Sequence, residues 1–248
     1  MPGSRSLLVV IPALNEEQSV GLVVKGVAAA VPDADILVVD DGSVDRTAEV
    51  AAAHGAAVIS NVFTLGVGGA LRVGFRYALA HGHRALVQVD GDGQHDPGDI
   101  AAIVAELVDD RVPMVVIGAR FAGKGNFDVP RLRGWAMRLL ASYLSRVTGT
   151  HLTDVTSGFR AHNRAAIELF ARNYPSDYLA DTVESLVLAS RAGGRVLQVP
   201  VEMHQRHFGT SSQSPLRAST YLVRVSFMLV LSIIRRRPKP QPSTEEAS

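Results

Sequence analysis

Apolar residues in the first half of the chain gather in five short runs, at residues 7–11, 36–40, 56–60, 85–90 and 114–118. The runs are rich in valine and isoleucine, and apolar and polar positions do not alternate within them. Such runs are typical of strands buried on both faces of a parallel sheet. Stretches with helical character separate the runs, at residues 16–30, 45–54, 69–81 and 97–109. This alternation predicts an α/β fold, with a mainly parallel sheet between helices and ligands at the carboxyl ends of the strands.

The second half of the chain has a different pattern, in which polar loops are more prominent. A glycine-rich loop at 120–130 precedes a predicted helix at 131–147, and a second polar loop covers 203–215. Between them the pattern predicts a short strand near 158–160, helices at 163–171 and 180–192, and a strand at 195–201. Residues 1–215 are therefore expected to form one domain.

The C-terminal region carries its own apolar segment. Arg224 is the one charged residue between residues 218 and 234, and three arginines close the segment at 235–237. A membrane-spanning helix needs ~20 mostly apolar residues, so a helix over 216–237 is expected to lie on the membrane interface with its basic residues near lipid phosphates. A helix packed on a partner protein is the alternative, because an apolar pattern does not separate the two. Residues 238–248 are predicted to be a disordered tail.

Composition narrows the classes of protein to consider. The 248 residues are 47% hydrophobic, which supports a sizeable core, and a net charge of +1 gives no case for a nucleic-acid binder. The absence of cysteine excludes disulfides, a thiolate nucleophile and Cys-ligated zinc. The first apolar run is interrupted by Pro12 and followed by Asn15 and two glutamates. It is therefore predicted to be a buried strand of a cytoplasmic protein and not a signal peptide.

The stretch QVDGDGQHDP at 88–97 is the strongest candidate for chemistry. Asp90 and Asp92 follow a predicted strand, and carboxylate ligands favour a hard cation, Mg²⁺ or Mn²⁺, over zinc. The glycines between and after them allow the backbone to approach a phosphate. An EF-hand is excluded, because His95 stands where that loop requires glycine and Ala101 where it requires glutamate. Asp96 is predicted to cap the helix that follows.

Two further stretches place polar residues at strand ends. In VVDDGSVDRT at 38–47, Asp40 and Asp41 end a strand and can accept hydrogen bonds from a nucleobase, while Ser43 is predicted to cap the next helix. In GVGGALRVGFRYA at 66–78, glycines open a helix, which suits a phosphate or close packing. Leu71 stands where the dinucleotide-binding fingerprint requires glycine, so a Rossmann dehydrogenase is disfavoured.

These stretches, together with VVIPALNEE at 9–17, occur in the order and spacing of the family 2 glycosyltransferases with the GT-A fold, and the chain most resembles their dolichol-phosphate mannose synthase branch. The resemblance implies a nucleotide pocket shaped by Pro12, Asn15 and Glu17, with Asp40 or Asp41 on the base or ribose. It also implies a donor site at Asp90, Gly91 and Asp92. In this site Asp90, Asp92 and Gln94 would bind Mg²⁺ or Mn²⁺ and bridge it to the donor diphosphate.

The same resemblance implies residues on the acceptor side. Arg120, and either Arg131 or Arg133, would face an acceptor phosphate. The segment TDVTSGFRAHNR at 153–164, with Asp154 and Ser157, would also lie on this side. Arg206 and Ser212 would belong to a loop that closes over the diphosphate. Asp92, Arg120, Arg131 and Arg206 are the residues expected to carry catalysis.

The resemblance implies an inverting, metal-dependent transfer of a hexose from a nucleoside-diphosphate sugar to a dolichyl or undecaprenyl phosphate, with GDP-mannose as the first donor to consider. A phosphate acceptor is ionised at neutral pH, since its second pKa is ~6, and needs arginines to hold it but no strong base. The enzyme is expected at the cytoplasmic membrane face, with a possible integral-membrane partner.

Two alternatives stay open at this point. The first is transfer to a glycan hydroxyl in polysaccharide assembly, which requires a general base such as Asp154, Asp181 or Glu184. The second is a non-catalytic scaffold that binds nucleotide sugars.

Overall fold

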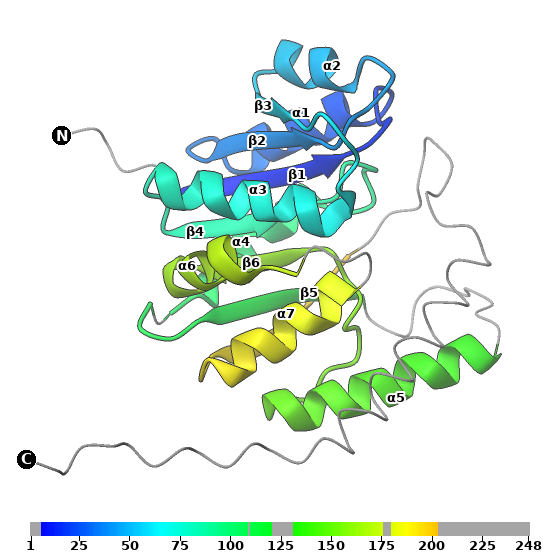
Figure 1. Ribbon diagram of the computed structural model, residues 1–248, viewed down its shortest axis with the longest axis vertical. Helices are drawn as coiled ribbons and strands as arrows, with labels where there is room; N and C mark the ends of the chain where they lie inside the picture. Colours follow the sequence, from blue (N-terminus) through cyan, green and yellow to red (C-terminus); the bar gives the residue numbers. More distant parts are fainter. Residues whose placement is uncertain (1–5, 109, 121–130, 176–179, 203–248) are drawn as a thin grey trace, which may run out of the picture. The chain divides into compact units, whose positions relative to one another are not determined.

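A computed structural model describes residues 6–108, 110–120, 131–175 and 180–202. The described residues form a seven-stranded sheet with the strand order β3-β2-β1-β4-β6-β5-β7 (Figure 1). The strands are β1 (Leu7–Ala13), β2 (Asp35–Asp40), β3 (Ala57–Ser60), β4 (Ala85–Gln88), β5 (Met114–Arg120), β6 (Arg160–Asn163) and β7 (Arg195–Val201). Among these strands β6 alone runs antiparallel to its neighbours, so the predicted, mainly parallel sheet is confirmed.

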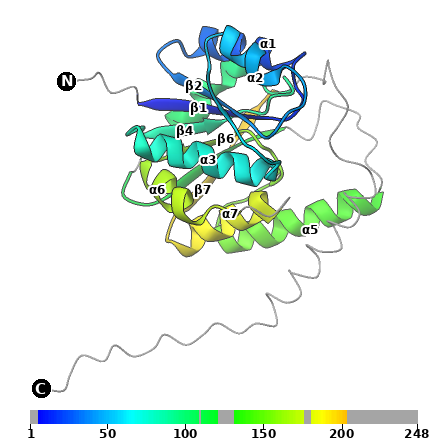
Figure 2. The same ribbon diagram turned by 45° about the horizontal axis from the view of Figure 1, so that its top comes forward.

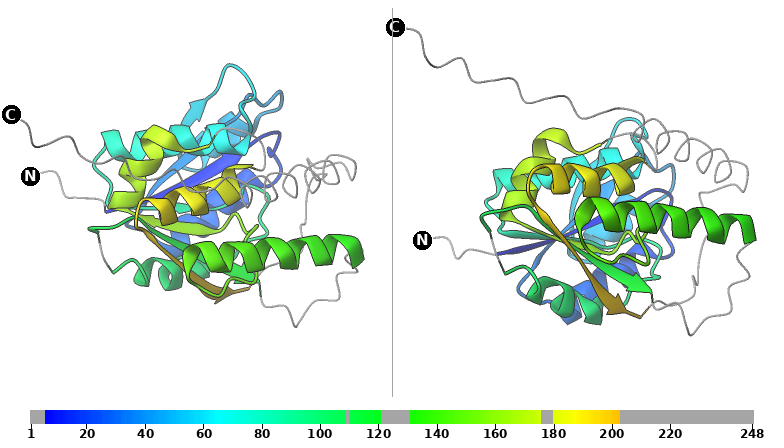
Figure 3. Two further views of the ribbon diagram at one scale, coloured as in Figure 1. Left: turned by 60° about the horizontal axis from the view of Figure 1, so that its bottom comes forward. Right: turned by 90° about the horizontal axis from the view of Figure 1, so that it is seen from below.

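Helices cover both faces of the sheet, as the alternating pattern predicted. The helices are α1 (Val20–Ala30), α2 (Thr47–Ala53), α3 (Gly66–Ala80), α4 (Ile100–Ala105), α5 (Arg131–Thr148), α6 (Arg164–Asn173) and α7 (Ala180–Arg191), with a 3-10 turn at Pro97–Asp99. Helices α1, α2 and α4 lie on one face, and α3, α6 and α7 lie on the other, with α5 beside α7 (Figures 2 and 3).

Strand β1 is apolar throughout because both of its faces are buried. Val9 and Ile11 belong to the core cluster that also contains residues of α1. Val10 points to the opposite face, under α3, where a Cβ added to Gly74 would lie 2.7 Å from its Cγ1. The glycine therefore lets α3 approach the sheet closely, and both faces of the strand are buried.

Several predicted boundaries differ from the structure. The run at 56–60 was expected to be buried on both faces, but β3 is the edge strand and its residues are exposed or half-buried. The strand predicted near 158–160 begins at Arg160, and the residues just before it form a loop. The helix predicted from residue 16 begins at Val20, because the preceding residues form hydrogen bonds with a neighbouring loop.

The predicted domain boundary at 215, the helix at 216–237 and the tail at 238–248 lie outside the described residues. Within the part of the chain that the structure describes, no helix is both long and apolar enough to cross a membrane.

Candidate active site

The sheet topology brings the candidate residues to one edge. The carboxyl ends of β1, β2, β4 and β5 point the same way, because these strands are parallel to one another. The amino end of the antiparallel strand β6 reaches this edge too, since Arg160 pairs with Gln88 at the end of β4. Ligands of open α/β sheets bind in the crevice outside such strand ends. This edge is therefore the place to look for an active site.

The loops after β1 and β2 hold each other through reciprocal hydrogen bonds. The backbone N–H of Asn15 donates to Ser43 Oγ at 2.9 Å, and the backbone N–H of Val44 donates to Asn15 Oδ1 at 2.9 Å. Asn15 has a φ of 56°, a left-handed conformation that asparagine tolerates better than most residues. The Asn15 side chain thus holds the loop after β2 against the loop after β1.

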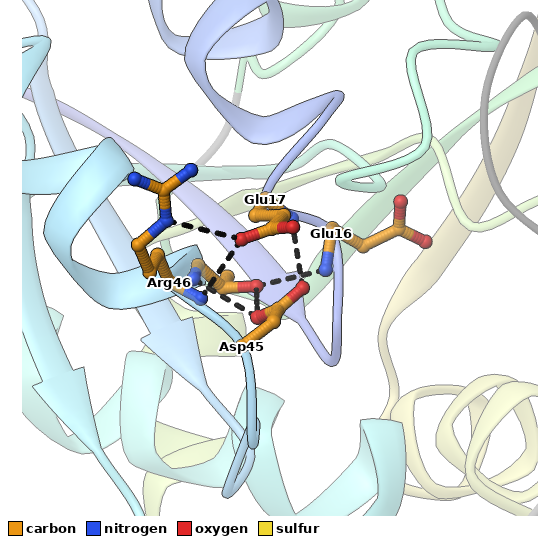
Figure 4. Close-up of polar contacts among 5 residues, drawn as sticks. Glu16, Glu17, Asp45 and Arg46 are labelled. Carbon is orange, nitrogen blue, oxygen red and sulfur yellow. Dashed lines mark hydrogen bonds and ion pairs between the residues drawn. The ribbon is translucent and has the colours of Figure 1, made fainter.

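Glu17 and Asp45 extend this connection (Figure 4). The backbone N–H of Glu17 donates to Asp45 Oδ2 at 3.2 Å, and the backbone N–H of Arg46 donates to Glu17 Oε2 at 3.2 Å. Thr47 donates to Asp45 from both its backbone N–H and its hydroxyl, and its hydroxyl oxygen accepts from the N–H of Glu16. Burial raises the pKa of Asp45, but the hydrogen bonds from Thr47 and Glu17 outweigh it and lower that pKa.

Asp40 and Asp41 are both buried at the end of β2, and their carboxylates form different contacts. Asp40 accepts a hydrogen bond from the backbone N–H of Ser43 at 3.0 Å. Asp41 accepts from Asn61 Nδ2 at 2.8 Å and from the backbone N–H groups of Leu65 and Gly66 at 2.9 and 2.7 Å. Asp41 therefore holds the start of α3, where N–H groups lack partners within the helix.

The prediction that Ser43 caps the next helix is wrong. Helix α2 begins at Thr47, four residues further along the chain, and Arg46 occupies its N-cap position. Ser43 Oγ accepts from Asn15 instead, because the β1 and β2 loops lie side by side in the folded chain.

Asp90 and Asp92 lie in the turn after β4. The carboxylate of Asp90 is 37% exposed and accepts a hydrogen bond from Gln88 Nε2 at 3.4 Å. Asp92 Oδ1 accepts from the backbone N–H of Gln94 at 3.1 Å, across a turn in which Gly93 has a φ of 74°. Asp90, Asp92 and Gln94 are all half-buried, so the predicted metal ligands come from a single short turn at the sheet edge.

The residues next to this turn confirm one further prediction. Asp96 accepts a hydrogen bond from the backbone N–H of Gly98 at 2.8 Å, with Pro97 at the first position of the turn, so it is the predicted cap. A Cβ added to Gly91 would lie 3.2 Å from the carbonyl oxygen of Pro12, which brings the turn after β4 against the end of β1. No group of three or more His, Cys, Asp or Glu side chains suited to a metal occurs in the described ranges.

Two residues beside Asp90 were not among the predicted site residues. A Cβ added to Gly158 would lie 2.5 and 2.7 Å from the two carboxylate oxygens of Asp90. His95 Nδ1 accepts a hydrogen bond from the backbone N–H of Asp90 at 3.3 Å, and its Nε2 lies 3.8 Å from Asp90 Oδ2. The position of His95 directly after Gln94 is the signal that could have drawn attention to it. No local signal indicates Gly158.

On the predicted acceptor side the structure describes one loop, at residues 153–159. Asp154 accepts from the backbone N–H and the hydroxyl of Thr156, at 3.2 and 3.0 Å. Ser157 is buried, and its Oγ accepts from the backbone N–H of Phe159 at 3.2 Å. The buried guanidinium of Arg160 donates to the carbonyl oxygens of Val155 and Ser157 at 2.8 and 2.9 Å. These contacts give the loop a defined shape at the site edge.

Arg160 also connects this loop to α7. Its Nη1 donates to the carbonyl oxygen of Thr182 at 3.0 Å and to Ser185 Oγ at 3.2 Å. Glu184, a candidate base for a hydroxyl acceptor, is exposed on the same helix.

The remaining predicted residues are placed less completely. Arg120 ends β5 at the candidate edge, and Arg131 and Arg133 lie in the first turn of α5. Their side chains, like that of Asp181 in α7, are outside the described part of the structure, as are Arg206 and Ser212 altogether.

Comparisons with known proteins show which sequences resemble this chain. The family model described as Glycosyl transferase family 2 matches residues 8–170. The chain is 33% identical, over 84% of its length and 87% of the relative's, to the undecaprenyl-phosphate mannosyltransferase of Micrococcus luteus. It is 30% identical, over 84% of its length and 80% of the relative's, to the polyprenol monophosphomannose synthase of Mycolicibacterium smegmatis.

A solved structure shares the fold. The glucosyl-3-phosphoglycerate synthase of Mycobacterium tuberculosis, crystallised with Mn²⁺, UDP and glucosyl-3-phosphoglycerate, superposes with a TM-score of 0.64. The match covers 92% of this chain and 79% of that one, at 23% identity. At that identity the likeness concerns the fold.

Proposed function

Because this chain belongs to the family 2 glycosyltransferases and has their GT-A fold, we propose that it transfers a hexose from a nucleoside-diphosphate sugar to a polyprenyl phosphate. The observation that carries the proposal is the pair Asp90 and Asp92 in the turn after β4, at the edge of the sheet where open α/β folds bind their ligands. The family assigns an enzyme, which sets aside the alternative of a non-catalytic scaffold. GDP-mannose is the first donor to test, because two relatives are named for mannose transfer.

The proposed reaction is one displacement at the anomeric carbon. An oxygen of the lipid phosphate forms a bond to that carbon while the carbon–oxygen bond to the donor diphosphate breaks, so the configuration inverts. The nucleoside diphosphate leaves with the electron pair of the broken bond. No proton has to move, because the acceptor phosphate is ionised at neutral pH, with a second pKa of ~6. Arg120, Arg131 and Arg206 are the proposed cationic partners of the two phosphate groups.

The turn after β4 suits a divalent cation. Asp90, Asp92 and Gln94 present carboxylate and amide oxygens, which hard cations such as Mg²⁺ and Mn²⁺ prefer. Asp90, Asp92 and Gln94 would hold the cation on the protein side, and in many proteins carboxylates bind Mg²⁺ together with substrate phosphates. When bound, the cation neutralises negative charge that develops on the diphosphate leaving group. The complex of the related synthase with Mn²⁺ and UDP supports a cation here, and either metal suits this donor set.

The loops after β1 and β2 are proposed to hold the nucleoside. Asn15 and Glu17 hold the loop after β2, because their side chains accept hydrogen bonds from the backbone N–H groups of Val44 and Arg46. This loop directly follows the buried Asp40. Asp41 already accepts three hydrogen bonds from the start of α3. Of the two aspartates, Asp40 is therefore the better candidate for the base or ribose. Gly91 lies close to the carbonyl oxygen of Pro12, so the turn after β4 packs against the end of β1.

The acceptor is proposed from the relatives, both of which are named for polyprenyl phosphates. The test is a panel of GDP-mannose, UDP-glucose and other nucleotide sugars, each given with Mg²⁺ or Mn²⁺ and a short-chain polyprenyl phosphate. The expected result is a polyprenyl-phosphate hexose from one donor. If the lipid phosphate yields no product while a lipid-linked glycan is extended, the acceptor is a hydroxyl. Asp154, Asp181 and Glu184 then become the candidate bases.

The segment at 216–237 is proposed to bring the catalytic domain to the cytoplasmic membrane face, where the lipid acceptor resides. Its basic residues suit anionic lipid headgroups, and its apolar residues suit the interface. Truncation after residue 215 should release the protein from liposomes that contain anionic lipid, measured by co-sedimentation. Equal sedimentation of the full chain and the truncated chain would refute this role. A membrane-protein partner is the competing explanation if the full chain also fails to bind liposomes.

A further inference from the structure

The carboxylate of Asp90 lies directly against the backbone of Gly158. A Cβ at that position would be 2.5 and 2.7 Å from the two carboxylate oxygens and 3.0 Å from Cγ. Real Cβ atoms do not approach other atoms so closely, so any residue with a side chain at position 158 would displace either the loop or the carboxylate. Glycine is thus required for Asp90 to hold its present orientation.

His95 contacts the same aspartate from the other side. Its side chain is 3% exposed, and its Nδ1 accepts a hydrogen bond from the backbone N–H of Asp90 at 3.3 Å. An Nδ1 that accepts this bond assigns the ring proton to Nε2 in the neutral imidazole. Nε2 lies 3.8 Å from Asp90 Oδ2, which is beyond hydrogen-bond distance but places the ring beside the carboxylate that is proposed to bind the cation.

Phe159 joins these two neighbours of Asp90. The His95 ring stacks on the Phe159 ring at 5.1 Å between centroids, with 20° between the planes. Phe159 directly follows Gly158 and is fully buried. The Phe159 ring fits because residue 118 is glycine: a Cβ on Gly118 would lie 2.6 Å from the ring. The backbone N–H of Gly118 also donates a hydrogen bond to the carbonyl oxygen of Phe159 at 2.8 Å. Arg160 anchors the other side of the loop to α7.

We propose that His95 and Gly158 are positioning residues for the metal ligand Asp90. Gly158 supplies the space in which the carboxylate lies, and His95 holds the backbone N–H of Asp90 and packs beside the carboxylate. This inference rests on the proposed metal site and adds to it the two neighbours that orient one ligand. Groups that orient metal ligands typically change metal affinity about 10- to 100-fold when they are substituted.

The test measures Mn²⁺ binding directly, from the electron paramagnetic resonance signal of free Mn²⁺, with the full chain and either GDP or UDP. Gly158→Ala should displace the carboxylate, and His95→Phe should keep the stacking on Phe159 but lose both ring nitrogens. Each is expected to weaken Mn²⁺ binding by about 10-fold or more. His95→Asn keeps an acceptor near the Nδ1 position, so it should bind Mn²⁺ more tightly than His95→Phe.

Two matched controls separate positioning from general damage. Gly74→Ala introduces a comparable clash, with Val10 on the other face of the sheet. His162→Phe removes another buried histidine, which lies among Phe75 and Phe170. Both controls are expected to lower the midpoint of thermal unfolding and leave Mn²⁺ affinity within about twofold of the wild type, because additivity holds for distant sites.

The outcomes distinguish the inference from the function it rests on. If wild type and Asp92→Ala bind Mn²⁺ equally, the metal site itself is misassigned and the proposed mechanism fails with it. If Asp92→Ala releases Mn²⁺ but folded Gly158→Ala or folded His95→Phe binds within about twofold of wild type, the positioning role alone is refuted. Should His95→Phe not fold, Gly158→Ala and His95→Asn decide the question by the same criterion.

Discussion

Replacing Asp41 with alanine should destabilise the protein through the start of α3. The buried carboxylate accepts hydrogen bonds from Asn61 and from the backbone N–H groups of Leu65 and Gly66. In the alanine variant these three donors lose a buried acceptor, while the donor residues themselves are half-buried (Asn61 and Gly66) or exposed (Leu65). The negative charge that offsets the dipole at the start of the helix is lost as well.

The loss of unfolding free energy in Asp41→Ala can be worked out from these contacts. Loss of a helix-capping acceptor costs about 0.5–2 kcal/mol. A fully buried donor left without a partner costs about 1–3 kcal/mol, and the three donors here should cost less because water can reach them in part. These terms overlap, because two of the three donors are the capped N–H groups themselves. The free energy of unfolding of Asp41→Ala should therefore be about 1–3 kcal/mol lower than that of wild type.

Urea denaturation followed by circular dichroism measures this difference. Asp41→Asn should recover part of it, since the amide oxygen still accepts but the amide nitrogen faces a donor. Asp33→Ala, at an exposed aspartate, is the control and should change the unfolding free energy by less than about 0.5 kcal/mol. If Asp41→Ala is as stable as wild type while its KM for the sugar donor rises, the carboxylate serves the nucleotide and not α3.

Three further predictions concern titration and catalysis. Burial and the charge of Arg160 lower the pKa of His162 to about 3. The unfolded chain therefore takes up a proton below about pH 6.5 that the folded chain does not, and unfolding free energy falls by at most about 1.4 kcal/mol per pH unit toward acid. His162→Phe should flatten that slope in urea titrations, and an unchanged slope would contradict the assignment. The lowered pKa of Asp45 also makes the folded protein less stable toward acid, but at lower pH. The stability that this carboxylate contributes is complete above the unfolded pKa of about 3.9 and is lost as the pH falls through the folded pKa. Asp45→Asn should remove this acid-dependent part, and an identical acid unfolding curve would argue against it. Asp92→Ala should lower kcat/KM about 100-fold or more, and a chelator should abolish wild-type turnover until Mg²⁺ or Mn²⁺ is restored; turnover that survives either treatment would contradict the metal mechanism.

Much of the fold could be predicted because its signals are local. Each central strand is buried on both faces, so its sequence is an unbroken apolar run that stands out from the helices around it. The antiparallel strand β6 was placed two residues early, since the apolar Phe159 belongs to a loop and packs against His95 from there. The exposure of β3 was missed, because burial of a strand depends on its place in the sheet order, which no single run contains.

In the candidate site, too, some features follow from the sequence and others from the tertiary structure. The sequence alone determined that carboxylates lie at the end of β2 and just after β4, and parallel topology is enough to bring such residues to one edge of the sheet. Tertiary structure decided what each carboxylate does there. Asp41 is used at the start of α3, since Leu65 and Gly66 reach it from a different segment. Asp90 is half-exposed and lies next to His95 and Gly158. Gly158 is close to Asp90 because β6, which begins two residues later, pairs with β4. Contacts between segments so far apart along the chain follow from packing, which leaves no local pattern in the sequence.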